Sequence, residues 1–173
     1  KLLNLILRKK LDLFILILLS VFLIFCNLGK ISLWSPDEPR FGSIVRHMVK
    51  NNDYIIPKFN GKNLYWKPIL VYWLMAVPSE IAGDVTEFTA RLPSAISALT
   101  VIAAFYFFLK QYTNRKIAFL SSLILITNYT FLEQARLAII DMTLTLFMLL
   151  AVISFYNGYC SIEIRRRWIV LFY

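Results

Sequence analysis

The chain alternates between long apolar runs and one extended polar segment. Helices need about 20 apolar residues to cross roughly 30 Å of hydrocarbon, and four runs approach or reach this length, at about 13–29, 92–109, 117–132 and 142–160. Residues 30–91 separate the first two runs, and we expect them to form an outer loop. The pattern predicts an all-α, polytopic transmembrane helical bundle, with amphipathic juxtamembrane helices in this first outer loop.

The outer loop opens with a pattern typical of an amphipathic helix. The segment Ser35-Pro36-Asp37-Glu38 puts Ser at the N-cap, Pro at N1 and Glu at N3, which predicts a capping box. Polar residues 51–53 predict the end of this helix. Its apolar stripe consists of Phe41, Ile44 and Met48. Asp37 is in line with the stripe at helical spacing, so we expect a helix that lies on the bilayer surface with Asp37 on its buried face.

The rest of the outer loop alternates between short apolar and polar segments. Residues 54–67 look extended, and Asn60-Gly61 predicts a hairpin turn between them. Pro57 and the short arms predict a loop hairpin and not a sheet. Residues 69–77 are apolar but too few to cross a membrane before Pro78, which predicts an interfacial or re-entrant helix. Residues 82–89 are predicted to form a polar loop.

Composition and charge support a membrane protein and give it an orientation. The chain is 59% hydrophobic, more than is usual for a soluble domain. Its net charge is +9, but the basic residues bracket the apolar runs instead of lining one face, so we expect no nucleic-acid partner. The short segments predicted to face the cytoplasm contain Lys1, Arg8, Lys9, Lys10, Lys110, Arg115, Lys116, Arg165, Arg166 and Arg167. This bias predicts a cytoplasmic N-terminus in an inner membrane, with the outer loop on the non-cytoplasmic face.

The four predicted spans are too few for a complete helical-bundle enzyme. It begins at Lys1 and stops within a new apolar segment that starts at Trp168. We therefore expect residues 1–173 to be the N-terminal part of one larger transmembrane domain. Cys26 and Cys160 fall near opposite ends of different spans, so we expect no disulfide between them.

The acidic pair at the start of the outer loop is the first candidate for chemistry. Acidic residues in a first helical turn often only cap the helix, and for Glu38 capping and function are equally good interpretations. For Asp37 we favour function, because a carboxylate on an apolar stripe at the bilayer edge suits a general base for an incoming hydroxyl or amine.

Several further charged residues are predicted to face the same side. Lys67 and Arg40 can bind a phosphate, although Lys67 could only snorkel to the interface and Arg40 could pair with the acidic residues. Asp141, at the start of the fourth run, is either an N-cap or a functional carboxylate. Arg91 and Arg136 are candidate substrate-binding residues, and an interfacial anchor is the alternative for Arg91.

Metal and nucleotide chemistry have little support in the sequence. The chain has one His and two Cys, and they form no ligand cluster of the kind that zinc requires. An acidic pair alone binds Mg²⁺ or Mn²⁺ weakly, so a divalent metal stays open. The chain also lacks a Gly-rich phosphate loop, which argues against a nucleotide donor.

An ordered series of motifs resembles the lipid-linked GT-C glycosyltransferases, specifically the bacterial branch related to protein O-mannosyltransferases and to the aminoarabinose transferase that modifies lipid A. The series extends over roughly residues 30–150. It consists of Trp34-Ser35-Pro36-Asp37-Glu38-Pro39-Arg40, Pro57-Lys58-Phe59-Asn60-Gly61, Lys67-Pro68 with Tyr72-Trp73-Leu74, Ala90-Arg91-Leu92-Pro93-Ser94, and Arg136 to Asp141-Met142.

The resemblance implies a polyprenyl-phosphate sugar as donor. It implies Asp37 as catalytic carboxylate, Lys67 near the donor phosphate, and Asp141 as a second acidic residue of the same cavity. Two positions depart from the family pattern. Ile69 replaces the second proline after the lysine, and Trp66 replaces an acidic metal ligand that the aminoarabinose transferases carry.

These observations lead to one functional hypothesis and two alternatives. We predict a membrane glycosyltransferase that moves a sugar from a polyprenyl phosphate to a lipid A-like or protein acceptor on the non-cytoplasmic face. A transporter or flippase would place its charges near the membrane midplane in repeated halves, whereas here they gather at one face and no repeat is found. A non-catalytic scaffold is the third interpretation, and the predicted position of Asp37 argues against it.

Overall fold

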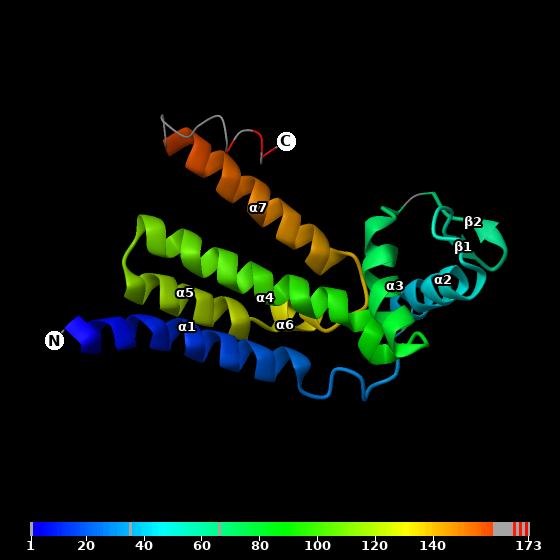
Figure 1. Ribbon diagram of the computed structural model, residues 1–173, viewed down its shortest axis with the longest axis horizontal. Helices are drawn as coiled ribbons and strands as arrows, with labels where there is room; N and C mark the ends of the chain where they lie inside the picture. The colour runs from blue at the N-terminus through cyan, green and yellow to red at the C-terminus, as the bar shows by residue number, and fades with distance from the viewer. Residues whose placement is uncertain are drawn as a thin grey trace.

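A helical bundle with a small outer subdomain at one end makes up the structure, a computed structural model (Figure 1). It describes residues 2–34, 36–65, 67–160, 168, 170 and 172, with side chains from Leu11 onward. The bundle consists of α1 (Leu2–Phe25), α4 (Glu87–Tyr112), α5 (Arg115–Thr127), α6 (Tyr129–Ala135) and α7 (Asp141–Cys160). The outer subdomain consists of α2 (Asp37–Asn51), β1 (Lys58–Phe59), β2 (Lys62–Asn63) and α3 (Leu70–Ala82).

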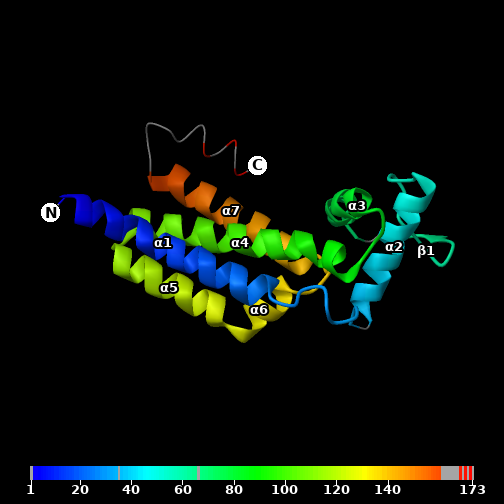
Figure 2. The ribbon, with the colours of Figure 1, turned by 60° about the horizontal axis from the view of Figure 1, so that its bottom comes forward.

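Helix α4 lies at the centre of the bundle and contacts α1, α5 and α7. The helices alternate in direction, so that the start of α1 and the turn between α4 and α5 lie at the end opposite the outer subdomain (Figures 1 and 2). Buried alanines of α4, such as Ala95 and Ala98, leave room for its neighbours to pack closely. Ile24 and Met142 are buried in the same cluster. Among the described residues, α4 and α7 are the two helices long and apolar enough to cross a membrane.

Three of the predicted spans correspond to bundle helices with shifted ends. The first corresponds to α1, which ends at Phe25 instead of residue 29. The fourth corresponds to α7, and the second corresponds to α4, which begins at Glu87 behind a Thr86 capping box instead of after a polar loop through residue 89. The continuous third span at 117–132 was wrong, because the chain breaks between α5 and α6. The Asn128 side chain accepts a hydrogen bond from the Phe131 N–H and so caps α6, a role that Asn strongly prefers.

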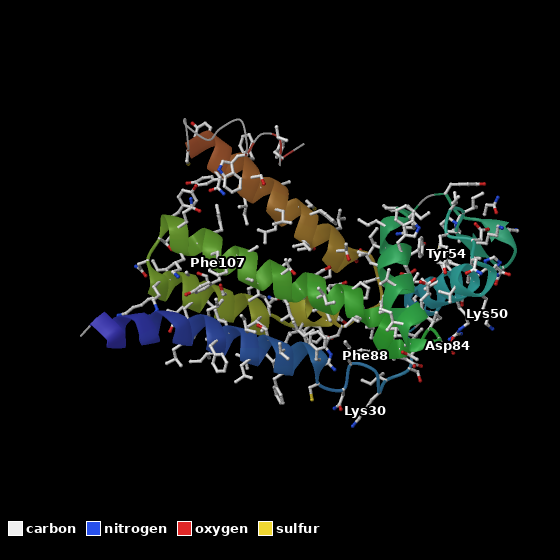
Figure 3. All side chains as sticks on the ribbon, in the orientation of Figure 1. Lys30, Lys50, Tyr54, Asp84, Phe88 and Phe107 are labelled. Atoms are coloured by element: carbon white, nitrogen blue, oxygen red, sulfur yellow. The ribbon has the colours of Figure 1, made fainter. Side chains whose placement is uncertain are left out.

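The outer subdomain contains the predicted amphipathic helix, but its apolar face is covered by protein. Phe41, Val45 and Met48 of α2 are buried in a cluster with residues of α3. Phe41 stacks on Tyr72 with ring centroids 5.3 Å apart. The prediction that this helix rests on the bilayer through its apolar stripe was therefore wrong. The side chains of this end, including Tyr54, lie far from Phe107 in the bundle (Figure 3).

The predicted hairpin turn is confirmed, but the prediction that its arms form no sheet was wrong. Strands β1 and β2 pair antiparallel, with Phe59 opposite Lys62. Asn60 and Gly61 between them both have positive φ, 50° and 75°, as a type I′ turn requires. The interfacial or re-entrant helix predicted at residues 69–77 corresponds to α3. This helix continues through Pro78 to Ala82 instead of ending before the proline.

Candidate active site

The acidic pair at the start of α2 divides into one buried and one exposed carboxylate. The side chain of Glu38 is 2% exposed, whereas that of Asp37 is 57% exposed. The prediction that Asp37 lies on the buried stripe was therefore wrong. Both positions are close to the stripe on the helix surface, and Glu38 takes the buried place because a buried carboxylate needs a charged partner, which Arg91 supplies.

Glu38 and Arg91 form a bidentate ion pair inside the protein. Arg91 Nε donates to Glu38 Oε1 at 2.9 Å, and Arg91 Nη2 donates to Oε2 at 2.8 Å. The backbone N–H of Trp34 donates to Oε2 at 2.6 Å, and that of Ala138 donates to Oε1 at 2.6 Å. One carboxylate thus joins the linker after α1, α2, α4 and the connection between α6 and α7.

The guanidinium of Arg91 extends this network to the linker between α1 and α2. Its Nη1 donates to the carbonyls of Leu28 at 2.9 Å and Ile31 at 2.7 Å, and its Nη2 donates to the carbonyl of Ser32 at 3.1 Å. Arg91 is 4% exposed. It is a buried structural centre, and the predicted roles of interfacial anchor and substrate ligand do not describe its contacts.

Two opposing effects act on the pKa of Glu38. Burial raises the pKa, but the hydrogen bonds from Arg91 and from the N–H groups of Trp34 and Ala138, together with the charge of Arg91, leave it below its ordinary value. Glu38 is therefore an ionised anchor with both oxygens engaged. The structure places Pro36 at the N-cap instead of the predicted N1, and Pro36 has no side-chain cap hydrogen bond. The predicted cap at Ser35 lies outside the described residues.

Asp37 is fixed in place through its neighbour while its own carboxylate faces outward. Its nearest charged partner is Arg40, whose Nη1 lies 3.5 Å from Oδ1. Arg40 is 40% exposed and also lies over the ring of Phe59, 5.9 Å from the centroid. The arrangement leaves the Asp37 carboxylate more than half exposed.

Lys67 and Asp141 are also exposed at this end of the molecule. Lys67 lies in the segment between β2 and α3, and its ammonium has no hydrogen-bond or ion-pair partner within the described part of the chain. Asp141 is the first residue of α7 and not its N-cap. Asp37 begins α2, Asp141 begins α7, and Lys67 lies between β2 and α3.

Arg136 has a structural role that the sequence did not indicate. Its Nη1 donates to the carbonyl of Leu23 at 2.9 Å, and its Nη2 donates to the carbonyl of Cys26 at 2.8 Å. These carbonyls belong to the C-terminal end of α1, where backbone acceptors need partners. Cys26 and Cys160 are both free and exposed.

The described residues do not fit a metal centre. No group of three His, Cys, Asp or Glu side chains within them is placed to hold an ion. The position at which the resembling transferases carry an acidic ligand is Trp66, which supplies no oxygen ligand. We therefore derive no step through a metal.

Comparison with known proteins places this arrangement in a family. A sequence model of the family described as dolichyl-phosphate-mannose-protein mannosyltransferase matches residues 66–173. The undecaprenyl phosphate-alpha-4-amino-4-deoxy-L-arabinose arabinosyl transferase of Aeromonas hydrophila is 36% identical over 125 residues, which are 72% of this chain and 23% of that protein. The transferase of the same name from Shewanella sediminis is 27% identical over 150 residues, 86% of this chain and 27% of that protein.

Two solved structures share the fold. They are the crystal structures of ArnT from Cupriavidus metallidurans in the apo state and bound to undecaprenyl phosphate, each with a TM-score of 0.83 and 25% identity over 91% of this chain and 30% of that one. The chain spans about a quarter of the length of these relatives. The resemblance and the GT-C-like membrane fold predicted from the sequence are confirmed. The chain belongs to the dolichyl-phosphate-mannose-protein mannosyltransferase family.

Proposed function

We propose that the full-length protein is a membrane glycosyltransferase that uses a polyprenyl-phosphate sugar as donor. The acceptor is a lipid A-like molecule or a protein. The family match and the related arabinosyl transferases support the donor class. The observation that carries the proposal is Asp37, an exposed carboxylate next to the buried anchor Glu38, at the end of the bundle that carries the outer subdomain.

The transfer step requires a base and a stabilised leaving group. The acceptor oxygen or nitrogen attacks the anomeric carbon of the sugar, and the bond from that carbon to the phosphate oxygen breaks. Asp37 takes the proton of the acceptor, and the polyprenyl phosphate leaves with the bonding electron pair. General-base catalysis of this kind contributes about 10²- to 10⁴-fold in rate.

Lys67 is the proposed partner of the departing phosphate. Its ammonium is free of other described groups and so can approach the negative charge that develops on the phosphate oxygens. Arg40 can assist, because a guanidinium that is 40% exposed keeps donors available for a phosphate. Asp141 is the proposed second carboxylate, acting on the same substrates from the start of α7.

Glu38 and Arg91 act in this proposal as positioning residues. They were predicted as catalytic and substrate-binding residues, yet their polar atoms are engaged inside the protein. By fixing the peptide that carries Asp37 against α4 and the α6–α7 connection, they hold the base in one place. Preorganisation of this kind is a large part of catalytic power.

The proposed orientation follows the charge bias of the helix ends. Lys110, Arg115 and Lys116 lie near the turn between α4 and α5, at the end opposite the outer subdomain (Figure 1). Arg115 forms an ion pair with Asp12 of α1 there. Since cytoplasmic segments are enriched in Lys and Arg, we place this end in the cytoplasm and the candidate active site on the outer face.

An activity assay on the purified full-length protein tests the proposal against the flippase alternative. Purified protein in detergent is given a polyprenyl-phosphate sugar and an acceptor, and release of polyprenyl phosphate is followed with time. A transferase turns over without a sealed membrane, whereas a flippase produces no new glycosidic bond under any condition. Release of polyprenyl phosphate that requires the acceptor supports the transferase. Movement of the polyprenyl-phosphate sugar across the membrane of sealed vesicles, without any glycosylated product, would support the flippase instead.

A further inference from the structure

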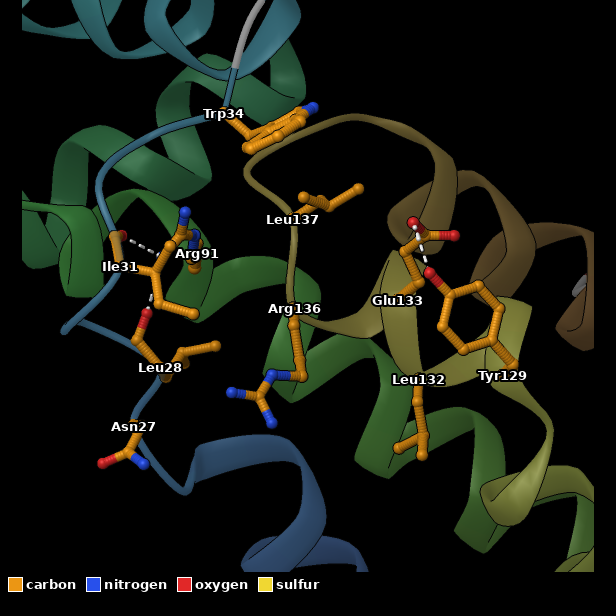
Figure 4. A pocket seen from close by; sticks show the side chains of 10 residues that line it. All are labelled: Asn27, Leu28, Ile31, Trp34, Arg91, Tyr129, Leu132, Glu133, Arg136 and Leu137. Atoms are coloured by element: carbon orange, nitrogen blue, oxygen red, sulfur yellow. Dashed lines mark hydrogen bonds between the residues drawn. The ribbon is translucent and has the colours of Figure 1, made fainter.

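A cavity of about 460 Å³ lies between the linker after α1 and helix α6 (Figure 4). Its lining includes Asn27, Trp34, Tyr129, Glu133, Arg136 and Leu137. The volume is within the usual range for small-molecule sites. The cavity is separate from the outward carboxylate of Asp37, which does not line it.

Besides Arg91, whose guanidinium is paired with Glu38, the cavity is lined by two opposite charges that do not neutralise one another. The Glu133 carboxylate accepts a hydrogen bond from the hydroxyl of Tyr129 at 3.2 Å. Arg136 uses two of the five N–H donors of a guanidinium on backbone carbonyls at the end of α1. Within the described part of the chain, neither residue forms an ion pair. A ligand with one negative and one positive group would complement both.

The apolar part of the cavity has the character of a membrane interface. Trp34 is 73% exposed and Tyr129 is 75% exposed, and these two residue types are enriched where hydrocarbon meets headgroups. Leu132 and Leu137 supply apolar lining next to the charges (Figure 4). The site also lies where α1, the first span predicted from the sequence, ends at Phe25.

We propose that this cavity binds the headgroup of an aminophospholipid of the phosphoethanolamine type. Glu133 binds the ammonium group, and the remaining donors of Arg136 bind the phosphodiester, with the Asn27 amide beside it. Leu132 and Leu137 contact the glycerol and the first methylenes of the chains. A lipid with phosphate but no amine is disfavoured, because Glu133 repels a second anion. The proposal does not depend on the catalytic function.

Native mass spectrometry of the full-length protein tests the headgroup preference. The protein is purified in detergent with equal amounts of phosphatidylethanolamine and phosphatidylglycerol, and the retained lipids are counted. We expect wild type to retain phosphatidylethanolamine preferentially. Glu133→Gln removes the negative charge at nearly constant shape, and we expect it to lower this retention roughly tenfold, the usual worth of one charged hydrogen bond.

The matched control is Glu80→Gln. Glu80 is also an exposed carboxylate that accepts a hydrogen bond from a tyrosine, Tyr54, but it lies outside the cavity. We expect Glu80→Gln to retain the lipid as wild type does. An equal loss in both variants, or equal retention of the two lipids by wild type, would overturn the proposal.

A second variant covers the case in which Glu133→Gln fails to fold. Leu137→Trp fills the cavity and leaves the hydrogen bond between Tyr129 and Glu133 in place. We expect this variant to lose bound phosphatidylethanolamine. Retention of that lipid by Leu137→Trp contradicts the proposal. Displacement of the lipid one for one by added polyprenyl phosphate also contradicts it, since the cavity would then belong to the donor.

Discussion

Glu38 accepts two hydrogen bonds from Arg91, a residue 53 positions further along the chain. The pair also binds backbone groups of two other segments, and both side chains are buried. One ion pair therefore fixes the outer subdomain to the bundle. Because Asp37 is adjacent to Glu38, the same pair fixes the position of the proposed base.

Loss of this pair should destabilise the protein strongly. Glu38→Gln leaves the Arg91 guanidinium buried without its counter-charge, and breaking a buried pair costs about 3–5 kcal/mol. Thermal unfolding of the full-length protein in detergent measures the effect. The control is Asp37→Asn at the neighbouring exposed position, where a change within about 0.5 kcal/mol is expected. Equal stability of Glu38→Gln and wild type would show that the pair is not an anchor.

The stability contributed by Glu38 should depend on pH in a defined direction. The pKa of Glu38 is lower in the folded protein than its ordinary value, so its contribution is complete above the unfolded-state pKa of about 4.3. The contribution is lost as pH falls from there through the folded-state pKa. Unfolding temperatures of wild type and Glu38→Gln between neutral and acid pH should therefore converge. Parallel curves for the two proteins would contradict the shift.

Asp37→Asn should remove catalysis while sparing the fold. A missing general base lowers kcat by about 10²- to 10⁴-fold, and donor KM should change little because Asp37 contacts the acceptor in this account. Initial rates of polyprenyl-phosphate release measure both constants. Asp84, an exposed acidic residue that pairs with Arg46 on the same subdomain, provides the control variant Asp84→Asn. Comparable losses in kcat for the two variants would refute a special role for Asp37.

Lys67→Ala should weaken donor binding and slow departure of the phosphate. A charge-assisted hydrogen bond is worth about 1.5–3 kcal/mol, which corresponds to roughly 10- to 100-fold in kcat/KM. Lys67→Arg should recover part of the loss, since it keeps the charge. The control is Lys62→Ala, an exposed lysine of β2, which should behave as wild type. Equal kcat/KM values for the two alanine variants would show that Lys67 does not contact the donor phosphate.

Close packing between the linker after α1 and the start of α4 should be sensitive to one methyl group. A Cβ at Gly29 would lie 2.9 Å from the Cβ of Phe88, closer than two carbon atoms pack. Gly29→Ala should destabilise the protein by about 1–3 kcal/mol, the usual cost of overpacking. Thermal unfolding measures this cost. An unchanged unfolding temperature would show that the two segments separate readily.

Apolar periodicity and turn residues predicted most of the elements, because both are local properties of the sequence. The Asn60-Gly61 turn and the end of α2 are examples, and both were predicted from a few adjacent residues. The break at Asn128 was missed, because the run from 117 to 132 is apolar throughout and one capping residue decides where it divides.

The assignment of the acidic pair shows where sequence reasoning fails. Asp37 and Glu38 are both near the apolar stripe, and the helical pattern alone favoured Asp37 for burial. The choice depends on Arg91 and on the N–H of Ala138, 100 residues away, which no local pattern reveals. The carbonyls that engage Arg136 were hidden for the same reason.

The most direct test of the central claim measures the lipids of cells that contain the full-length protein. Mass spectrometry compares polyprenyl-phosphate sugars and lipid A in membranes with wild type and with Asp37→Asn. Accumulated polyprenyl-phosphate sugar together with loss of a modified acceptor, in lipid A or on protein, is the predicted result for Asp37→Asn. Identical donor pools and identical acceptors in the two strains would contradict the proposal that Asp37 is the base of a glycosyltransferase.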